Sequence, residues 1–302
     1  MSVSRTILHK DGPSISRMVM GTWRLLDEPA MTSQQVLTLI KTCCEEGITT
    51  FDEADIYGDY GSEELFGKAL SLDPAMRDKI EVITKCGIKL ISGKKPDHKI
   101  KHYDTSKEHI IRSVENSLSL MGLEHIDVLL LHRPDPLMHP DEVAEAFHLL
   151  NEHGKVYHFG VSNFSVSQFE LLQASCDMPL VTNQIEISLA HRDTLLDGTV
   201  DYLMQQGAAP MAWSPFGGGE IFKKNNSTER LHAKFDELSQ KYENASYDQL
   251  TLAWLLSHPA KIVPILGTRK LDRIKAATQV EGIQLSRQDW FALWEAAGGQ
   301  IP

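Results

Sequence analysis

Eight short apolar runs alternate with longer amphipathic stretches along the 302-residue chain, and this alternation is the strongest constraint on its fold. Several runs lack polar alternation, which is typical of strands buried on both faces of a parallel sheet. Eight strands that are each followed by a helix predict an α/β fold, a (β/α)₈ TIM barrel, in a single domain over residues 1–302. The expected strands lie at 16–23, 48–55, 80–87, 126–136, 156–164, 180–186, 209–216 and 261–269.

The stretches between the runs carry the start and stop signals of helices. A Ser or Thr followed three residues later by Glu or Gln can form a capping box, and such pairs are Thr32–Gln35, Thr105–Glu108, Ser165–Gln168 and Ser246–Gln249. Gly47 and Gly122 are expected to end the first two of these helices. Residues 4–17 predict an N-terminal β-hairpin that closes the bottom of the barrel, and residues 92–106 and 214–230 predict long loops.

The overall charge limits the kind of partner. The formal net charge of −11 argues against a nucleic-acid backbone or an anionic membrane as the main partner, but it allows a small anionic ligand at a local basic cluster. The four cysteines lack the spacing of a disulfide framework or a zinc site, which favours reduced thiols. The N-terminus has no apolar signal-peptide core, and no apolar run approaches the ~20 residues of a membrane span. We therefore expect a cytoplasmic protein.

Every expected strand ends in polar or aromatic residues, and in a TIM barrel these ends meet at the active-site face. Each residue alone has an ordinary explanation: Asp52 could cap a turn, Lys85 could be a surface charge, and His132 could be structural. Several such residues at one barrel mouth indicate a shared site instead. The strand-end residues are Thr22, Trp23, Asp52, Lys85, His132, Ser162, Asn163, Asn183, Gln184, Trp213, Ser214, Thr268 and Arg269.

The motifs at these ends resemble those of the aldo-keto reductases, and within them a bacterial YdhF-like subgroup. In chain order they are GTW, FDEADIYG, ITKCG, LLLHRPDP, GVSNF, NQIE, AWSPFGGG and PILGTRKLDR, and the resemblance spans about residues 16–278. The resemblance implies a catalytic tetrad of Asp52, Tyr57, Lys85 and His132. It further implies an NADPH-dependent reduction of an aldehyde or ketone to an alcohol, with Tyr57 as the general acid.

The same resemblance implies a set of cofactor contacts. Ser162, Asn163 and Gln184 would hold the nicotinamide carboxamide, and Trp213 would stack on the nicotinamide ring. The full set is Gly21, Thr22, Trp23, Ser162, Asn163, Gln184, Trp213, Ser214, Pro215, Phe216, Gly217, Gly267, Thr268, Arg269 and Arg273. The basic residues from 269 to 273 open a predicted helix, whose N–H groups and charge suit the extra phosphate of NADPH, with NADH as a weaker alternative. Gly267 stands where some members of that family have a lysine, and Ala277 where many have an asparagine.

These residues predict a definite division of roles. The unperturbed pKa of tyrosine is about 10, and a neighbouring Lys85 ammonium is expected to lower it for Tyr57. Asp52 would keep Lys85 charged, and His132 would orient the substrate oxygen. We expect Asp55, Asp59 and Tyr60 to be solvated loop residues. Glu53 stands where relatives often have Thr or Ser, and the sequence does not explain it.

Two other classes of function were weighed against a reductase. A metal-dependent hydrolase on the same barrel needs paired histidines after the first strand, where this chain has GTW, so we expect no metal site. A cofactor-binding sensor with slow turnover, similar to the potassium-channel β subunits, would keep the fold and the cofactor. We expect a monomer that binds a small-molecule carbonyl substrate, and the sequence does not identify that substrate.

Overall fold

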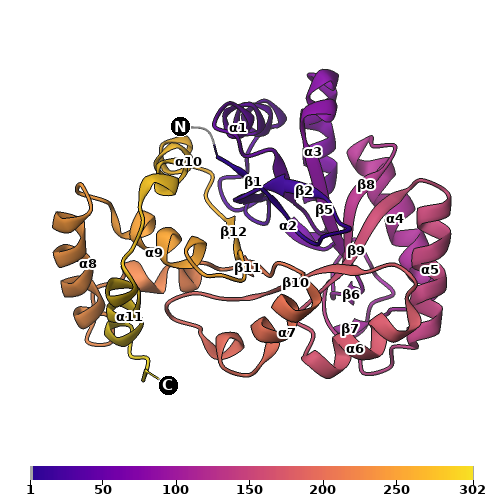
Figure 1. Cartoon of the computed structure of the whole chain (residues 1–302). Coiled ribbons are helices and arrows are strands. Elements are labelled where there is room, and N and C mark those ends of the chain that lie inside the picture. Colours follow the sequence, from indigo (N-terminus) through magenta and orange to yellow (C-terminus); the bar gives the residue numbers. More distant parts are fainter. Residues whose placement is uncertain (1–2, 302) are drawn as a thin grey trace.

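A closed barrel of eight parallel strands forms the centre of the computed structural model, which describes residues 3–301 (Figure 1). Each strand lies within one of the predicted apolar runs, and the last strand pairs with the first, so the predicted TIM barrel is confirmed. In barrel order the strands are β3 (Val19–Gly21), β4 (Thr50–Asp52), β5 (Glu81–Cys86), β8 (Ile126–Leu131), β9 (Val156–Ser162), β10 (Leu180–Glu186), β11 (Met211–Trp213) and β12 (Val263–Leu266).

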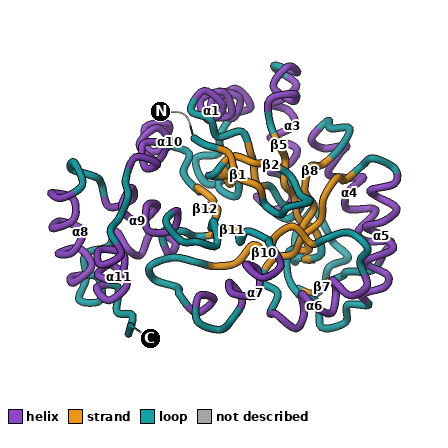
Figure 2. The backbone as a smooth tube through the Cα atoms, viewed as in Figure 1, coloured by secondary structure: helices purple, strands orange, loops and turns teal. Residues whose placement is uncertain are grey.

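Helices surround the strands, as the purple segments of the tube around the orange strands show (Figure 2). The helices of the ring are α1 (Ser33–Glu45), α3 (Ser62–Ser71), α4 (Lys107–Met121), α5 (Pro140–Glu152), α6 (Val166–Ser175), α7 (Thr199–Gln206), α9 (Tyr247–Leu256) and α10 (Leu271–Thr278). Two further helices, α8 (Glu229–Lys241) and α11 (Arg287–Ala296), pack outside α9 (Figure 1). Within residues 3–301, no helix is both long and apolar enough to cross a membrane.

Short 3₁₀ turns and a single tight turn complete the connections. The 3₁₀ turns are η1 (Pro74–Lys79), η2 (Asp193–Leu195), η3 (Gly217–Phe222) and η4 (Gln279–Gly282), and the tight turn is α2 (Tyr57–Tyr60). The predicted loop at 214–230 therefore contains η3. The predicted loop at 92–106 contains β7 (His102–Tyr103), which pairs antiparallel with β6 (Ile88–Lys89) in a small sheet that the sequence did not predict.

Three of the four predicted capping boxes are present, at Thr32–Gln35, Ser165–Gln168 and Ser246–Gln249. The fourth prediction was wrong by one residue, because Ser106 and not Thr105 accepts the hydrogen bond from the backbone N–H of His109. The Thr105 hydroxyl instead donates to Asp135 Oδ2 at 2.9 Å, in the loop after β8. A side chain that is used in a tertiary contact is not free to cap its own helix.

Apolar side chains fill both faces of the barrel sheet, which explains why the strands read as unbroken apolar runs. The outer faces pack against the helices in one large cluster of buried residues. A second cluster fills the barrel interior and consists of Leu8, Ile15, Val19, Ile83, Val128, Leu130, Val181, Ala209, Met211, Val263 and Ile265. The interior is thus a packed core, and polar chemistry is left to the strand ends.

The predicted N-terminal hairpin is confirmed by β1 (Arg5–Ile7), which pairs antiparallel with β2 (Ser14–Ser16). Leu8 and Ile15 from this hairpin are fully buried in the interior cluster, so the hairpin closes the bottom of the barrel.

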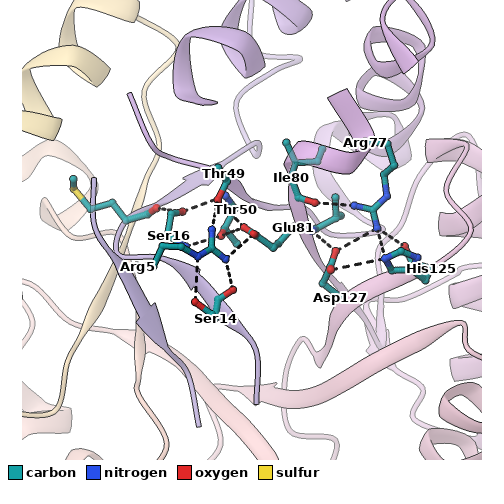
Figure 3. A network of polar contacts seen from close by, with 12 residues as sticks. Arg5, Ser14, Ser16, Thr49, Thr50, Arg77, Ile80, Glu81, His125 and Asp127 are labelled. Carbon is teal, nitrogen blue, oxygen red and sulfur yellow. Dashed lines mark hydrogen bonds and ion pairs between the residues drawn. The ribbon is translucent and has the colours of Figure 1, made fainter. Parts of the chain in front are cut away.

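A polar network attaches the hairpin to the starts of the strands (Figure 3). The Arg5 guanidinium donates to Glu81 Oε1 at 2.7 Å, to Thr49 Oγ1 at 3.0 Å and to Ser14 Oγ at 3.1 Å. The hydroxyls of Thr49 and Thr50 donate to Glu81 Oε2 at 2.8 and 2.7 Å. One carboxylate therefore connects the hairpin, β4 and β5.

A second carboxylate lies beside this network, at the start of β8 (Figure 3). Asp127 Oδ2 accepts from the backbone N–H of Val82 at 2.7 Å and from the guanidinium of Arg77 at 3.4 Å. Arg77 also donates to the carbonyl oxygen of Ile80 at 2.9 Å. These contacts tie the start of β8 to β5 and to η1.

We predict that Glu81→Ala lowers the free energy of unfolding by about 2 kcal/mol, because it removes a charged acceptor and leaves two threonine hydroxyls without it. The measurement is the urea midpoint at constant m-value. Glu237→Ala on the exposed face of α8 is the control and should stay within about 0.5 kcal/mol of the parent protein. Equal shifts for both variants would show that the network at the barrel bottom contributes nothing measurable.

Candidate active site

The four predicted catalytic side chains come together at the carboxyl end of the barrel. Asp52 ends β4, Lys85 lies near the end of β5, His132 directly follows β8, and Tyr57 begins the turn α2. Lys85 Nζ donates to Asp52 Oδ2 at 2.7 Å, to the Tyr57 hydroxyl oxygen at 3.0 Å and to the carbonyl oxygen of Glu53 at 2.8 Å. The rings of Tyr57 and His132 meet edge to face with centroids 5.8 Å apart.

A left-handed turn carries Tyr57 to this position. Gly58, Asp59 and Tyr60 all have positive φ, at 57°, 52° and 60°. A Cβ atom on Gly58 would lie 2.5 Å from the side chain of Leu26, so both the conformation and the space require glycine.

Tyr60 holds the turn in place and is not the solvated loop residue that the sequence predicted. Its hydroxyl oxygen accepts from the backbone N–H of Leu90 at 2.8 Å, in the loop after β5. Asp59 is exposed, in line with its prediction. Two non-glycine residues in the left-handed region are uncommon, and the contact with Leu90 helps to hold this conformation.

Lys85 is a charged group with no solvent exposure. Burial by itself would lower the pKa of Lys85, but the nearby Asp52 carboxylate and the Tyr57 phenol outweigh burial and raise the pKa. The ammonium form therefore dominates at neutral pH, and its three acceptors satisfy its three N–H donors.

The pKa of Tyr57 corrects the expectation from the sequence. Burial raises this pKa by more than Lys85 lowers it, so the net shift is upward from 10. The physical reason is that Lys85 is already paired with Asp52, so only part of its charge is available to favour a phenolate. Tyr57 is thus a protonated phenol at neutral pH, with a cation beside it that can stabilise the phenolate once the proton leaves.

His132 is a neutral imidazole in this environment. Burial lowers its pKa well below 6.5, and the positive charges of Lys85, Arg133 and Lys101 lower it further. Its Nδ1 atom is enclosed and has no hydrogen-bond partner in the described part of the chain. A neutral imidazole keeps one N–H donor and one acceptor, which suits a hydrogen bond to a substrate oxygen.

A chain of hydrogen bonds extends from the tetrad to the predicted carboxamide-holding residues. Gln184 Nε2 donates to Asp52 Oδ1 at 2.8 Å, and the Ser162 hydroxyl donates to the Gln184 carbonyl oxygen at 2.8 Å. Asn163 Nδ2 donates to Ser162 Oγ at 2.7 Å, and Trp213 Nε1 donates to Asn163 Oδ1 at 3.0 Å. The structure therefore places these candidates next to the four predicted catalytic residues. The link is the hydrogen bond from Gln184 of β10 to Asp52 of β4, which the sequence did not indicate.

The candidates after β3 border the same site, and those after β11 directly follow Trp213 in the chain. The Thr22 hydroxyl donates to the carbonyl oxygen of Asp52 at 2.9 Å, and the Trp23 ring, 60% exposed, lies 6.5 Å from that of Tyr57. The residues of the loop after β11 are Ser214, Pro215, Phe216 and Gly217, with positive φ at Ser214 and Gly217. Gly21 ends β3 and packs against Ile265 of β12.

The two predicted phosphate-binding arginines differ in their surroundings. The Arg269 guanidinium donates to the carbonyl oxygens of Asp27 at 3.0 Å and Pro29 at 2.9 Å, so it connects the loop after β12 to the loop after β3. Arg273 is exposed on α10, and within residues 3–301 its side chain has no hydrogen bond or ion pair. Gly267 and Thr268 lie in the loop between β12 and α10, where Thr268 Oγ1 accepts from the backbone N–H of Lys270.

The model of the aldo/keto reductase family matches residues 17–297. The chain belongs to the aldo/keto reductase family. The oxidoreductases YcsN of Bacillus subtilis and YdhF of Escherichia coli are 46% and 44% identical to it, covering 94% and 98% of this chain and 95% and 98% of their own lengths. A 6-dehydroglucose reductase of Agrobacterium fabrum is 44% identical over 96% of this chain and 97% of its own.

A solved structure supports the fold of this reductase independently. A thermostable aldo-keto reductase, Tm1743, superimposes with a TM-score of 0.82 at 24% identity and covers 97% of this chain and 99% of its own. The protein is accordingly an NAD(P)H-dependent oxidoreductase of the family, and the resemblance seen in its motifs is confirmed.

Glu53 of the reductase is a buried carboxyl group that the sequence left unexplained. It has no solvent exposure, and neither carboxyl oxygen has a well-formed hydrogen bond within residues 3–301. Burial and the neighbouring Glu63 raise the pKa of Glu53 to about 8, whereas the hydroxyls of Thr22 and Ser62 and the Lys85 charge oppose the shift. Glu53 is therefore mainly protonated at neutral pH, while its backbone oxygen accepts from Lys85.

Two more carboxyl groups of the reductase lie close to Glu53. Glu63 accepts hydrogen bonds from Thr84 at 2.7 Å and Ser117 at 3.0 Å, and burial raises its pKa. The pKa of Asp55 is also raised, first by burial and then by Glu63, and its Oδ1 atom is enclosed without a partner in the described chain. The prediction of a solvated Asp55 was therefore wrong: the residue is partly buried, and its backbone N–H donates to the Lys85 carbonyl oxygen at 3.1 Å, a contact with β5 that the sequence alone could not show.

We predict that Glu53→Gln flattens the dependence of stability on pH. Glutamate ionises near 4.5 in the unfolded chain but near 8 in the folded one, so unfolding releases a proton between these values and stability falls as the pH rises through them. Glutamine keeps the size and cannot ionise, so the variant should be more stable than the parent at pH 8, by up to several kcal/mol.

Urea midpoints measured from pH 5 to pH 8 test this expectation. Exposed Glu64→Gln on α3 is the control and should leave the slope unchanged. Parallel slopes for Glu53→Gln and the parent protein would mean that Glu53 is ionised in the folded state.

Proposed function

We propose that this reductase converts an aldehyde or ketone to an alcohol with NADPH, and that Tyr57 supplies the proton. The observation that carries the proposal is the buried Lys85 ammonium, placed 2.7 Å from Asp52 and 3.0 Å from the Tyr57 oxygen. A fully buried cation with three acceptors is expensive to desolvate, and its use as a partner for the phenol accounts for its presence.

The residues around the tetrad fit a nicotinamide cofactor, which would supply the hydride. The amide side chains of Asn163 and Gln184 can hold a carboxamide group, and the Trp213 ring offers an apolar face to an aromatic ring. Arg273 is available for a phosphate because its side chain has no partner within residues 3–301. Arg269 is engaged with backbone oxygens, so we propose that it shapes this part of the site and that Arg273 recognises the phosphate.

The protein's own part in the proposed reaction is to deliver one proton to the substrate oxygen. A carbonyl oxygen that gains negative charge needs donors, and the Tyr57 hydroxyl and the neutral His132 imidazole can both donate to it. Tyr57 then gives its proton to that oxygen. Lys85 stabilises the phenolate that remains, and Asp52 keeps Lys85 charged and oriented.

The first substrates to test are aldehydes derived from sugars. Two relatives are named 6-dehydroglucose reductases, at 44% and 34% identity. The hydroxyl-rich character of such compounds suits a site whose mouth carries many polar side chains. We propose this class for the present reductase on the strength of those relatives.

We predict that Tyr57→Phe lowers kcat for carbonyl reduction by roughly 10² to 10⁴, because it removes the transferable proton and keeps the ring. NADPH affinity should be nearly unchanged. Tyr157→Phe, with its ring at the exposed start of β9, is the matched control and should retain parent activity. Parent-like kcat for Tyr57→Phe on a substrate whose chemical step limits turnover would refute Tyr57 as the acid.

Lys85→Met extends this test to the partner of the phenol. Loss of the cation disfavours the phenolate and raises the pKa of Tyr57 further, so the basic limb of the pH profile should move to higher pH. Combined with Tyr57→Phe, the two losses should not add, because Lys85 acts through Tyr57. If the losses of activity in the double variant added in full, Lys85 and Tyr57 would act independently of each other.

We predict that Arg273→Ala weakens NADPH binding and hardly affects NADH. Loss of a charge-assisted hydrogen bond costs about 1.5 to 3 kcal/mol, which is roughly a 10- to 150-fold rise in Kd. Fluorescence titration with each cofactor measures the effect. Arg287→Ala at the start of α11 is the control. If the affinities for NADPH and NADH fell equally, Arg273 would not recognise the extra phosphate of NADPH.

A further inference from the structure

The loop after β5 carries a concentration of positive charge that is at odds with the protein as a whole. Residues 88–103, here called the basic loop, contain five lysines and one aspartate, whereas the chain has a formal net charge of −11. Lys89 pairs with Asp104 at 3.0 Å. The other four lysines have no carboxylate oxygen within 4.0 Å among residues 3–301, and they are Lys94, Lys95, Lys99 and Lys101. Such a local excess of charge attracts anions.

The basic loop is folded and attached to the catalytic turn. Its ends pair as β6 and β7, and its Leu90 N–H donates to the hydroxyl oxygen of Tyr60, three residues after Tyr57. The His98 ring bonds the Leu90 carbonyl oxygen at 2.9 Å and lies edge to face against the Tyr60 ring. Lys95 Nζ lies 5.2 Å from the centre of that ring. The lysines are therefore presented on a fixed scaffold beside the active site.

Two cations connect the basic loop to the reacting centre. The backbone N–H of His132 donates to the Cys86 carbonyl oxygen at 2.8 Å, and that of Asp104 donates to the Gly87 carbonyl oxygen at 2.9 Å, so the segment of Lys101 and the segment of Arg133 meet at the end of β5. Burial and Lys85 lower the pKa of His132 most, and the charges of Arg133 and Lys101 lower it further. The Arg133 guanidinium lies 5.5 Å from the centre of the Trp213 ring, and it too has no carboxylate partner in the described chain. An anion bound between the loops after β5 and β8 would meet charges that are otherwise unpaired.

These cations are separate from the segment proposed for the cofactor phosphate. In the closed barrel β8 is the fourth strand along from β12 and β5 is the third, so the loops after β5 and β8 lie across the mouth from the loop that leads to Arg273. A ligand that spans the site would thus meet two positive regions, one for the cofactor and one for something else.

We propose that the basic loop, together with Arg133, is an anion subsite of the substrate pocket. Among carbonyl compounds, sugar-derived aldehydes included, the preferred substrates would then be those with a carboxylate, phosphate or sulfonate group away from the carbonyl. The inference rests on the proposed carbonyl reduction. Its physical basis is that an anionic substituent pairs with Lys101 and Arg133 while its carbonyl reaches Tyr57 and His132.

Pairs of aldehydes that differ in one charged group test the subsite. Succinic semialdehyde is compared with butanal, and glyceraldehyde 3-phosphate with glyceraldehyde, by the ratio of kcat/KM within each pair. We expect the anion to be preferred by about tenfold or more. Raising the salt from about 0.05 to about 0.5 M should reduce that ratio. A larger ratio for the phosphate pair would assign the subsite to phosphates, and a larger one for the other pair to carboxylates.

Charge variants locate the effect on the basic loop. Lys101→Met and Arg133→Met should each lower the anion-to-neutral ratio several-fold, whereas Lys101→Arg keeps the charge and should retain it. Lys10→Met is the control, because Lys10 is an exposed lysine of the hairpin at the opposite end of the barrel. Ratios that are unaffected by both methionine substitutions would overturn the subsite.

The outcomes separate this inference from the proposed function. Reduction of the neutral and charged partners at equal kcat/KM overturns the anion subsite and leaves carbonyl reduction intact. If no compound is reduced, calorimetry tests the subsite without turnover. The Kd of each compound of the same pairs is measured for the Tyr57→Phe protein in the presence of NADP⁺. Tighter binding of the charged partner supports the subsite even then, and equal affinity overturns it.

Discussion

The buried ammonium of Lys85 is the interaction on which the rest of the site depends. A cation without solvent exposure needs three acceptors, and it finds them in Asp52, the Glu53 backbone and Tyr57. Removal of any partner would leave a buried charge incompletely compensated, which costs several kcal/mol. The ends of β4 and β5 and the turn α2 are therefore coupled through one nitrogen atom. Gln184 extends the coupling to β10 through its bond to Asp52.

The barrel makes this arrangement stable because it keeps polar chemistry at one end. The interior cluster and the N-terminal hairpin fill and close the barrel below the site. Several strands are only three residues long, so a shift of one residue in their register would move the residue at the strand end away from the site. The carboxylate of Glu81 fixes the starts of β4 and β5, and in this way the register that places Asp52 beside Lys85 is held from below.

The electrostatics of the mouth are arranged in layers. Burial raises the pKa values of three carboxyl groups close to the Lys85 pair, Glu53, Asp55 and Glu63, and for Glu53 the pKa reaches about 8. Lys95 of the basic loop lies over the Tyr60 ring and Arg133 over the Trp213 ring, and neither has a carboxylate partner among residues 3–301. Acidic groups that are neutral do not cancel the positive potential, so an acidic protein can still present a positive pocket.

The sequence by itself determined the class of fold and pointed to the four candidate catalytic residues. Eight apolar runs with polar ends specify a barrel with chemistry at one face, since strands buried on both sides can tolerate polar residues only where they end. The motifs around Asp52, Tyr57, Lys85 and His132 carried the family, and three of four helix caps followed from local spacing.

The tertiary structure alone decided the charge states and the neighbours of these residues. The pKa of Tyr57 rises because burial outweighs Lys85, and burial depends on packing from distant segments. The sequence predicts Asp55 and Tyr60 as solvated residues, but in the fold Asp55 bonds the Lys85 backbone and Tyr60 bonds the Leu90 backbone. Thr105 loses its predicted capping role to a contact with Asp135. A local sequence pattern shows which roles a residue can take. Desolvation and pairing with residues far away in the sequence decide its charge state and its partners, and both arise only when the chain has folded.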